Sequence, residues 1–188
     1  MSKTLISDRN FSENIPQVEL KNISKNYLSL KLTERQVCDI ELILNGAFKP
    51  LNGFLNQDDY ESVLQKMRLL NQAIWPIPIT LDITKSFREK IELNQKIILK
   101  DPESFPLAIL SVDSIWKPEL DKEALLVYGT KDTYHPGVNY LLNMTNKFYV
   151  GGSLEGIQLP RHYDYDDYRH TPFQLKSKMN DMGWDKVV

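Results

Sequence analysis

The apolar residues of this chain come in short runs, each closed by a turn or by a helix-capping signal. Lys96–Lys100 and Pro106–Val112 are apolar runs of strand length, joined by the turn-forming segment 101–105. Thr33 and Gln36 have the spacing of a capping box, and apolar residues at helical spacing follow them. Short strands and short helices in one chain are typical of an α+β domain, and we expect a partly closed β-barrel with peripheral helices.

Other stretches carry weaker signals for single elements. Three patterns predict strands: the alternation of Leu28 and Leu30 with serines, the alternation of Ile77, Ile79, Leu81 and Ile83 with polar residues and prolines, and the apolar residues between 148 and 159. Helices are predicted after Asn56 (inner face Tyr60, Val63, Leu64 and Met67), over 119–128 (Leu120, Ala124 and Leu125), and from Thr171 to Gly183 (Leu175, Met179 and Met182).

Length and charge exclude several classes of protein. A chain of 188 residues suits one domain, or one domain with an appendage, and a net charge of −2 gives no general attraction to nucleic acid or to anionic lipid. No stretch approaches the ~20 apolar residues needed to span a bilayer, and the first residues lack the apolar core of a signal peptide. The single cysteine, Cys38, fits a reducing compartment. We therefore expect a cytoplasmic protein with neither nucleic acid nor membrane as a partner.

The two ends of the sequence differ from its middle. Residues 1–15 are polar and aperiodic, and we expect them to form a flexible N-terminal arm. Residues 185–188 read as the opening of a buried strand that would lead into another element. This pattern predicts a fragment, or the front module of a larger protein.

Histidine and cysteine give few candidates for chemistry. His135, His162 and His170 lack the tight spacing of a zinc site, so we expect loop histidines that form local hydrogen bonds, with a metal site as the alternative. Cys38 lies beside the apolar stripe of the capped helix, and we expect a buried, inert thiol rather than a nucleophile.

The segment 161–169 gathers aromatic residues, acids and two arginines. Stacking and charge there could contact a nucleotide, but its carboxylates would repel phosphate, so an ordered connector is the preferred interpretation. Gly151, Gly152 and Gly156 do not fit the G-x-G-x-x-G spacing and are interpreted as bends in strands. Segment 51–55 is interpreted as a structural turn in which Gly53 supplies unusual backbone angles.

Several of these segments, taken in order, resemble the sulfate adenylyltransferase (ATP sulfurylase) family. The resemblance covers nearly the whole chain from about residue 16, with one visible departure at Asn52, where many relatives have Glu. The matching segments are Leu32–Gly46, Pro50–Leu55, Trp75–Asp82, Asp101–Leu110, His135–Tyr140 and Tyr149–Ile157.

The resemblance implies an N-terminal PUA-like domain at 16–183, and 184–188 as the truncated start of a catalytic nucleotidyltransferase domain. The family's Gln-x-Arg-Asn-Pro stretch and His-x-x-His pair, which hold ATP phosphates and sulfate, occur nowhere in these 188 residues. No catalytic, cofactor-binding or metal-binding residue is therefore assigned to this segment, which we expect to be inactive by itself.

For the parent enzyme, the resemblance implies attack of sulfate on the α-phosphorus of ATP, with Mg-ATP as the nucleotide and adenylyl sulfate and pyrophosphate as products. The expected partners are the catalytic domain of the same polypeptide, ATP and sulfate; a homo-oligomer, a fused adenylyl-sulfate kinase domain and the direction of the reaction stay open. Two alternatives are an RNA-binding PUA-like module and a small enzyme that works through 161–170.

Two structural expectations follow from this interpretation. Residues 16–183 are expected to fold independently, because caps, strands and turns agree locally with one compact fold. The surface that a catalytic domain would cover is expected to expose an apolar patch near Trp184, Val187 and Val188.

Overall fold

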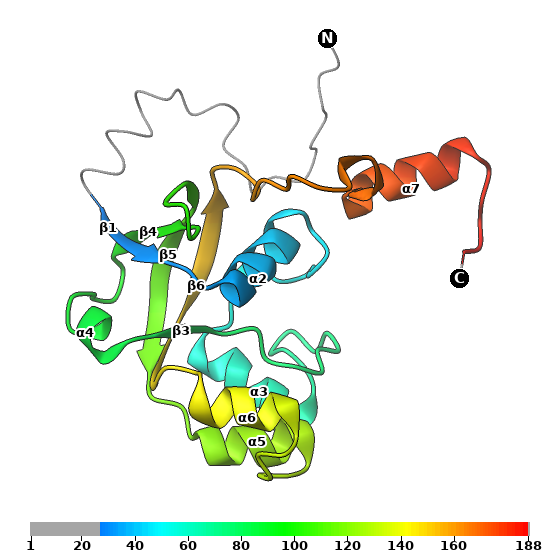
Figure 1. Cartoon of the computed structure of the whole chain (residues 1–188). Helices are drawn as coiled ribbons and strands as arrows, with labels where there is room; N and C mark the ends of the chain where they lie inside the picture. Colours follow the sequence, from blue (N-terminus) through cyan, green and yellow to red (C-terminus); the bar gives the residue numbers. More distant parts are fainter. Residues whose placement is uncertain (1–26, 188) are drawn as a thin grey trace. The chain divides into compact units, whose positions relative to one another are not determined.

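The computed structural model describes residues 27–187, which form helices and a six-stranded sheet (Figure 1). The expected arm at 1–15 lies outside the described residues. The strands are β1 (Leu28–Lys31), β2 (Gly53–Phe54), β3 (Leu81–Ile83), β4 (Lys96–Lys100), β5 (Pro106–Trp116) and β6 (Phe148–Gly156). The helices are α2 (Glu34–Leu44), α3 (Gln57–Lys66), α4 (Lys85–Arg88), α5 (Leu120–Tyr128), α6 (Pro136–Asn143), α7 (Pro172–Asp181) and the 3₁₀ helix η1 (Asp166–Tyr168). Among these described helices, none is long and apolar enough to cross a bilayer.

The sheet has the strand order β1-β4-β5-β6-β2, and β3 pairs with β6 outside this path. Both short partners of β6 run antiparallel to it: Phe54 of β2 lies opposite Gly152, and Leu81 of β3 lies opposite Val150. The sheet does not close on itself, so the predicted α+β fold with a partly open barrel is confirmed.

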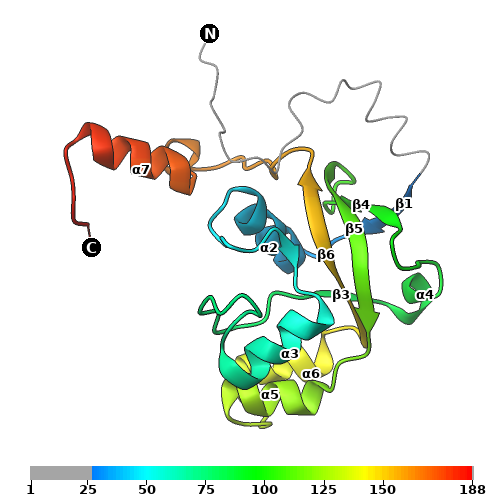
Figure 2. The ribbon, with the colours of Figure 1, turned by 180° about the vertical axis from the view of Figure 1, so that it is seen from behind.

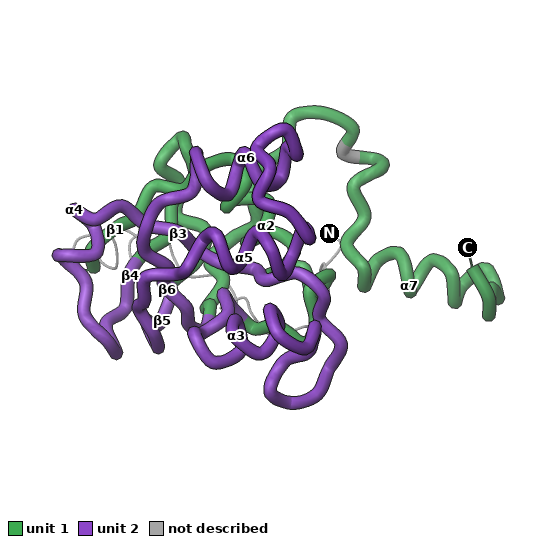
Figure 3. Tube along the Cα trace, turned by 90° about the horizontal axis from the view of Figure 1, so that it is seen from below, with its two compact units in different colours: residues 1–52, 98–109, 154–188 green, residues 53–97, 110–153 purple. Residues whose placement is uncertain are grey.

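The chain divides into two compact units (Figure 3). Unit 1 comprises residues 1–52, 98–109 and 154–188, and unit 2 comprises residues 53–97 and 110–153.

In unit 1, the capping box predicted from sequence starts α2. The Thr33 hydroxyl accepts from the Gln36 N–H, and the Gln36 side-chain oxygen accepts from the Thr33 N–H at 2.9 Å. Ile40 and Ile43 of this helix are fully buried. Gly46 follows the helix with φ +83°, the left-handed conformation expected at that place.

In unit 2, α3 and α5 contact each other, and α5 packs against α6 (Figure 2). Ala124 of α5 and Val138 and Leu141 of α6 share one small apolar cluster. The predicted faces of α3 and α5 are right at Tyr60, Val63, Leu64 and Ala124, which are buried, and wrong at Met67 and Leu125, which are 61% and 48% exposed. Helix α6 was not predicted.

The strand predicted at 77–83 is shorter in the structure. Only Leu81–Ile83 pairs as β3, and Ile77 is 54% exposed. All three β3 residues are buried, including Asp82, whose carboxylate accepts two hydrogen bonds from Asn146 at 2.8 and 2.9 Å. The alternation of apolar and polar residues therefore did not mean that one face of the strand is exposed to solvent. The polar residue is a buried carboxylate with hydrogen-bond partners.

A polar centre lies inside the core of unit 2. The Tyr60 and Tyr149 hydroxyls donate to one oxygen of the buried Glu123 carboxylate at 2.9 and 3.0 Å. The Trp116 ring packs against both tyrosine rings, with centroids 5.5 and 5.6 Å away. Burial first, and the Glu123 charge second, raise the pKa of both tyrosines far above the ordinary value. Both hydroxyls therefore keep their protons in the folded chain.

This centre predicts a loss of stability in alkali. Above about pH 10 the unfolded chain releases these two protons and the folded chain does not, so the stabilisation is complete below pH 10 and falls as the pH rises. Each tyrosine lowers the free energy of unfolding by about 1.4 kcal/mol per pH unit, or roughly 2.7 kcal/mol per unit for the pair. Urea unfolding at pH 9, 10 and 11 measures this slope. Tyr60→Phe should roughly halve it, and a flat profile through pH 11 would contradict the account.

Candidate functional site

The sequence cluster at 161–170 lies in unit 1, between β6 and α7. We name residues 157–170 the connector, with a stem (157–163) and a turn (164–170). The stem begins bonded to β5: the N–H groups of Ile157 and Gln158 donate to the Leu107 carbonyl at 2.8 and 3.2 Å. The Gln158 side-chain amide donates to the Pro106 carbonyl at 2.9 Å. The stem is therefore tied to the sheet at its start.

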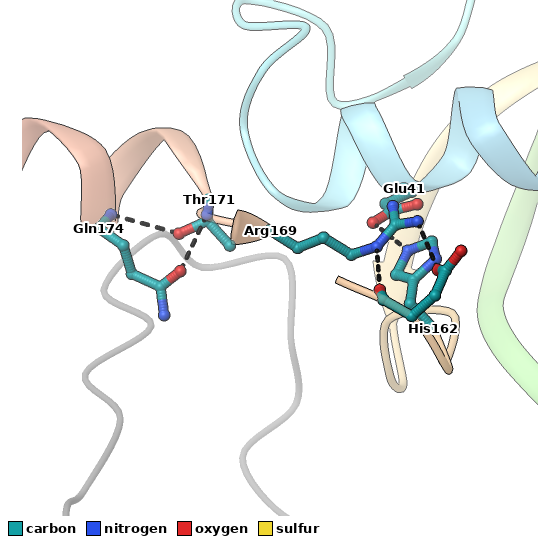
Figure 4. Close-up of polar contacts among 6 residues, drawn as sticks. Glu41, His162, Arg169, Thr171 and Gln174 are labelled. Carbon is teal, nitrogen blue, oxygen red and sulfur yellow. Dashed lines mark hydrogen bonds and ion pairs between the residues drawn. The ribbon is translucent and has the colours of Figure 1, made fainter. Parts of the chain in front are cut away.

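Two side-chain contacts hold the rest of the stem. His162 Nε2 lies 2.8 Å from Glu41 Oε1 on α2, and the two side chains are only 28% and 24% exposed (Figure 4). The Arg161 guanidinium lies over the Phe105 ring, 5.6 Å from its centroid. The stem is therefore ordered, and the interpretation of the segment as a connector between two domains stays a prediction.

The turn holds itself closed. Arg169 donates to the Asp164 carbonyl and carboxylate, both at 3.0 Å. Between these residues, Tyr165 has φ +55° and η1 forms its single helical turn. The side chains of Tyr165 and Tyr168 are 73% and 82% exposed. The turn therefore presents aromatic rings to solvent.

The basic groups of the connector do not converge on one point. Arg161 faces Phe105, His162 faces Glu41, and Arg169 faces Asp164. Binding of phosphates or sulfate requires several donors aimed at one place. This geometry therefore disfavours the interpretation of 161–170 as an independent active site.

Helix α7 follows the turn and is well terminated. Thr171 forms a capping box with Gln174 (Figure 4), and Pro172 occupies the first turn. No residue of α7 is buried, so the prediction that Leu175, Met179 and Met182 line an inner face is wrong for the part of the chain that the structure describes. The physical reason is that no described element covers this helix.

The residues after α7 form no strand. Trp184 and Val187 are 54% and 51% exposed, so the buried strand predicted at 185–188 is wrong over 185–187, and Val188 lies outside the described residues. The expected apolar exposure at Trp184 and Val187 is confirmed. Phe173, Leu175 and Met182 of the helix region are also 41–44% exposed.

The other two histidines form separate local contacts. His135 is the N-cap of α6, where its Nδ1 accepts from the Val138 N–H at 3.4 Å, and its ring packs on Tyr128. His170 is exposed, and its backbone N–H donates to Tyr168. Within residues 27–187, no three His, Cys, Asp or Glu side chains gather in a way that could hold a metal ion.

Cys38 is exposed on α2, so the prediction of a buried thiol is wrong. It follows Gln36, and the buried positions of the helix are Gln36, Ile40, Ile43 and Leu44. The buried face therefore includes the capping glutamine and excludes Cys38. The position of a residue beside an apolar stripe therefore does not show that the residue belongs to the buried face.

Glycine has a different role from the predicted one. Gly53 is not in a left-handed conformation: it lies in β2, where a Cβ would sit 1.9 Å from the Gly152 carbonyl oxygen. A Cβ on Gly151 would sit 2.1 Å from the Leu55 oxygen. Both glycines therefore permit close approach of backbones around β6, rather than a turn or a phosphate cradle.

Sequence reasoning missed the Tyr60–Glu123–Tyr149 centre and a small open hollow beside it. The hollow lies between α3 and the start of α5, and Tyr60 and Trp116 line it together with Glu61, Glu119, Lys117 and Lys122. Two acids and two lysines give this lining no net formal charge. Hydrogen bonding across 63 and 26 residues of sequence leaves no local signal by which this centre could have been found.

Comparison with known proteins agrees with the fold. The family model described as "PUA-like domain" matches residues 4–159. The chain is 50% identical to sulfate adenylyltransferase of Kluyveromyces lactis over 165 residues, which are 88% of this chain and 33% of the relative. It is 48% identical to the enzyme of Saccharomyces cerevisiae over 88% of this chain and 32% of the relative, and 38% identical to that of Schizosaccharomyces pombe over 100% and 39%.

A solved structure titled "Hexameric APS kinase from Thiobacillus denitrificans" has a TM-score of 0.68 and 27% identity. The match covers 88% of this chain and 28% of that chain. The chain thus spans about a third of the length of the curated relatives it matches. The family match extends over most of the sequence and agrees with the open sheet, and the chain belongs to the PUA-like domain family, in a form shared with sulfate adenylyltransferases.

Proposed function

We propose that this chain is the N-terminal, supporting domain of a sulfate adenylyltransferase. The parent enzyme would make adenylyl sulfate and pyrophosphate from ATP and sulfate, with catalysis in a nucleotidyltransferase domain of the same polypeptide. The proposed division is an arm at 1–15, the PUA-like domain at 16–183, and the first residues of the catalytic domain at 184–188. The names and lengths of the relatives support this proposal.

The observation that carries the proposal is the uncovered helix α7. Isolated helices shorter than about 12–15 residues are marginal in water, and most helical stability in proteins comes from packing of an apolar face. Helix α7 has ten residues, none of them buried, and it is followed by the exposed Trp184 and Val187. A catalytic domain on this side would bury these groups.

The described residues do not fit Mg-ATP. Sulfate is a weak nucleophile, so adenylyl transfer depends on positioning and on cationic groups gathered around the phosphates. The connector spreads its basic groups over three different partners, and residues 27–187 bring together no trio of metal ligands. The proposal therefore places no catalytic, cofactor-binding or metal-binding residue among residues 27–187, and no step of the reaction on their side chains.

The proposal also places the protein in the cytoplasm. It includes assembly into homo-oligomers, because the similar solved structure is described as hexameric. An RNA-binding role has less support, because the net charge of −2 offers no electrostatic footprint. A salt-dependent RNA shift assay with the purified chain should give no complex. A shift that weakens steeply with salt would favour the RNA-binding alternative.

The coding sequence downstream of the codon for Val188 tests the proposal. We expect it to continue with a Gln-x-Arg-Asn-Pro stretch and a His-x-x-His pair, because the resemblance to the sulfate adenylyltransferase family implies these phosphate-holding motifs for the catalytic domain. The measurement is direct sequencing of the transcript. A stop codon at position 189, or a continuation that lacks both motifs, would contradict the assignment.

A further inference from the structure

The connector contains two polar clasps that differ in their exposure to water. The stem clasp joins His162 to Glu41, whose side chains are 28% and 24% exposed. The turn clasp joins Arg169 to Asp164, whose side chains are 43% and 64% exposed. Exposed pairs are screened by water and salt, and such pairs contribute little to stability. The turn clasp is therefore the weaker of the two.

The stem has further anchors that the turn lacks. Residues Ile157 and Gln158 are bonded to the first residues of β5, and Arg161 lies over Phe105. Together with the stem clasp, these contacts join the stem to three separate parts of unit 1: α2, the 101–105 turn and β5. Opening of the stem would break all of them together.

Among the side chains and backbone groups that the structure describes, the turn forms its hydrogen bonds within itself. Arg169 reaches back to Asp164, and the Tyr168 and His170 N–H groups donate to Tyr165 and Tyr168. Tyr165, with φ +55°, has a backbone conformation that bulky residues rarely adopt. A turn held by one exposed clasp over a strained residue can open at low cost.

We propose that residues 164–170 are a hinge that the Arg169–Asp164 clasp closes, and that the Glu41–His162 pair anchors the stem so that movement is confined to this hinge. Opening the clasp changes the direction of α7 and leaves the stem in place. What α7 carries rests on the proposed function, whereas the hinge itself is a property of the described chain.

The single native cysteine makes this testable in the chain of residues 1–188. Cys38 is exposed on α2 and Ser177 is exposed on α7, so spin labels on Cys38 and on Ser177→Cys report the distance between these helices by double electron–electron resonance. In this labelled parent we expect one dominant distance. Arg169→Gln should raise the population at other distances by about three- to fivefold, and high salt should act in the same direction on the parent.

The stem anchor has its own variant and a matched control. His162→Ala should broaden the distribution further than Arg169→Gln, because the stem then moves as well. His170→Ala makes the same change of side chain at an exposed connector position and should reproduce the parent. A thermal unfolding midpoint within error of the parent for all three variants would show that the effect is local.

Three results would overturn the inference: an unchanged distribution in Arg169→Gln, a distribution in His162→Ala as narrow as in the parent, or equal broadening in His170→Ala. The measurement involves neither ATP nor sulfate. Its failure would therefore leave the proposed function standing, and failure of the proposed function would leave the hinge standing.

Discussion

Gly152→Ala is expected to lower the free energy of unfolding by more than about 4 kcal/mol, or to prevent folding. Gly152 lies in the middle of β6 with φ +155°, and a Cβ there would sit 1.9 Å from the Ser111 carbonyl oxygen and 3.1 Å from the Asp113 nitrogen. Both atoms belong to the backbone of β5, which pairs with β6. They cannot rotate away as a side chain can, so the two strands would have to separate.

Gly129→Ala is the matched control. Gly129 follows α5 with φ +71°, and a Cβ there meets nothing within 4 Å. Only the left-handed backbone is then penalised, by about 1–2 kcal/mol. Urea unfolding of both variants separates backbone strain from collision. Equal losses in the two variants would show that the close approach of β5 and β6 is not tight.

Local signals predicted the elements whose ends are set by their own residues. The capping boxes at Thr33 and Thr171, the N-cap at Asn56 and the glycines that end α2 and α7 all depend on atoms within a few residues of each other. Helix α6 shows the limit of this approach. Its N-cap is a histidine, an uncommon capping residue, and its eight residues give too few turns for a clear periodicity.

Burial was harder to predict than element type. Cys38 and Met67 lie beside apolar stripes and are exposed, whereas Asp82 and Glu123 are polar and buried. The reason is that a buried carboxylate needs partners that are distant in sequence, and the Asn146 and tyrosine groups that bond these acids are 26 to 64 residues away. Without knowledge of such pairings, a single sequence shows only which residues are polar and does not show which of them are buried.

The candidate site illustrates the same division. The sequence identified 161–169 as an ordered connector, because it concentrates charges and aromatic rings between a strand and a capped helix. It gave no indication that His162 bonds Glu41, 121 residues earlier in the chain. It also predicted that the apolar residues of α7 pack against another element, but none of the described elements covers them.

We expect this chain to support catalysis without performing it, and a pyrophosphate-release assay on purified residues 1–188 measures whether it has activity of its own. Loss of one preorganised donor typically costs about 2.7–4 kcal/mol in an active site, and this segment lacks the whole phosphate-holding set. The assay contains ATP, Mg²⁺ and molybdate as a sulfate mimic, with Saccharomyces cerevisiae sulfate adenylyltransferase as the positive control. The account predicts no release above a heat-killed sample and no saturable ATP binding by calorimetry. Turnover above that background, abolished by His162→Ala or Arg169→Gln, would contradict it and place an active site in the connector.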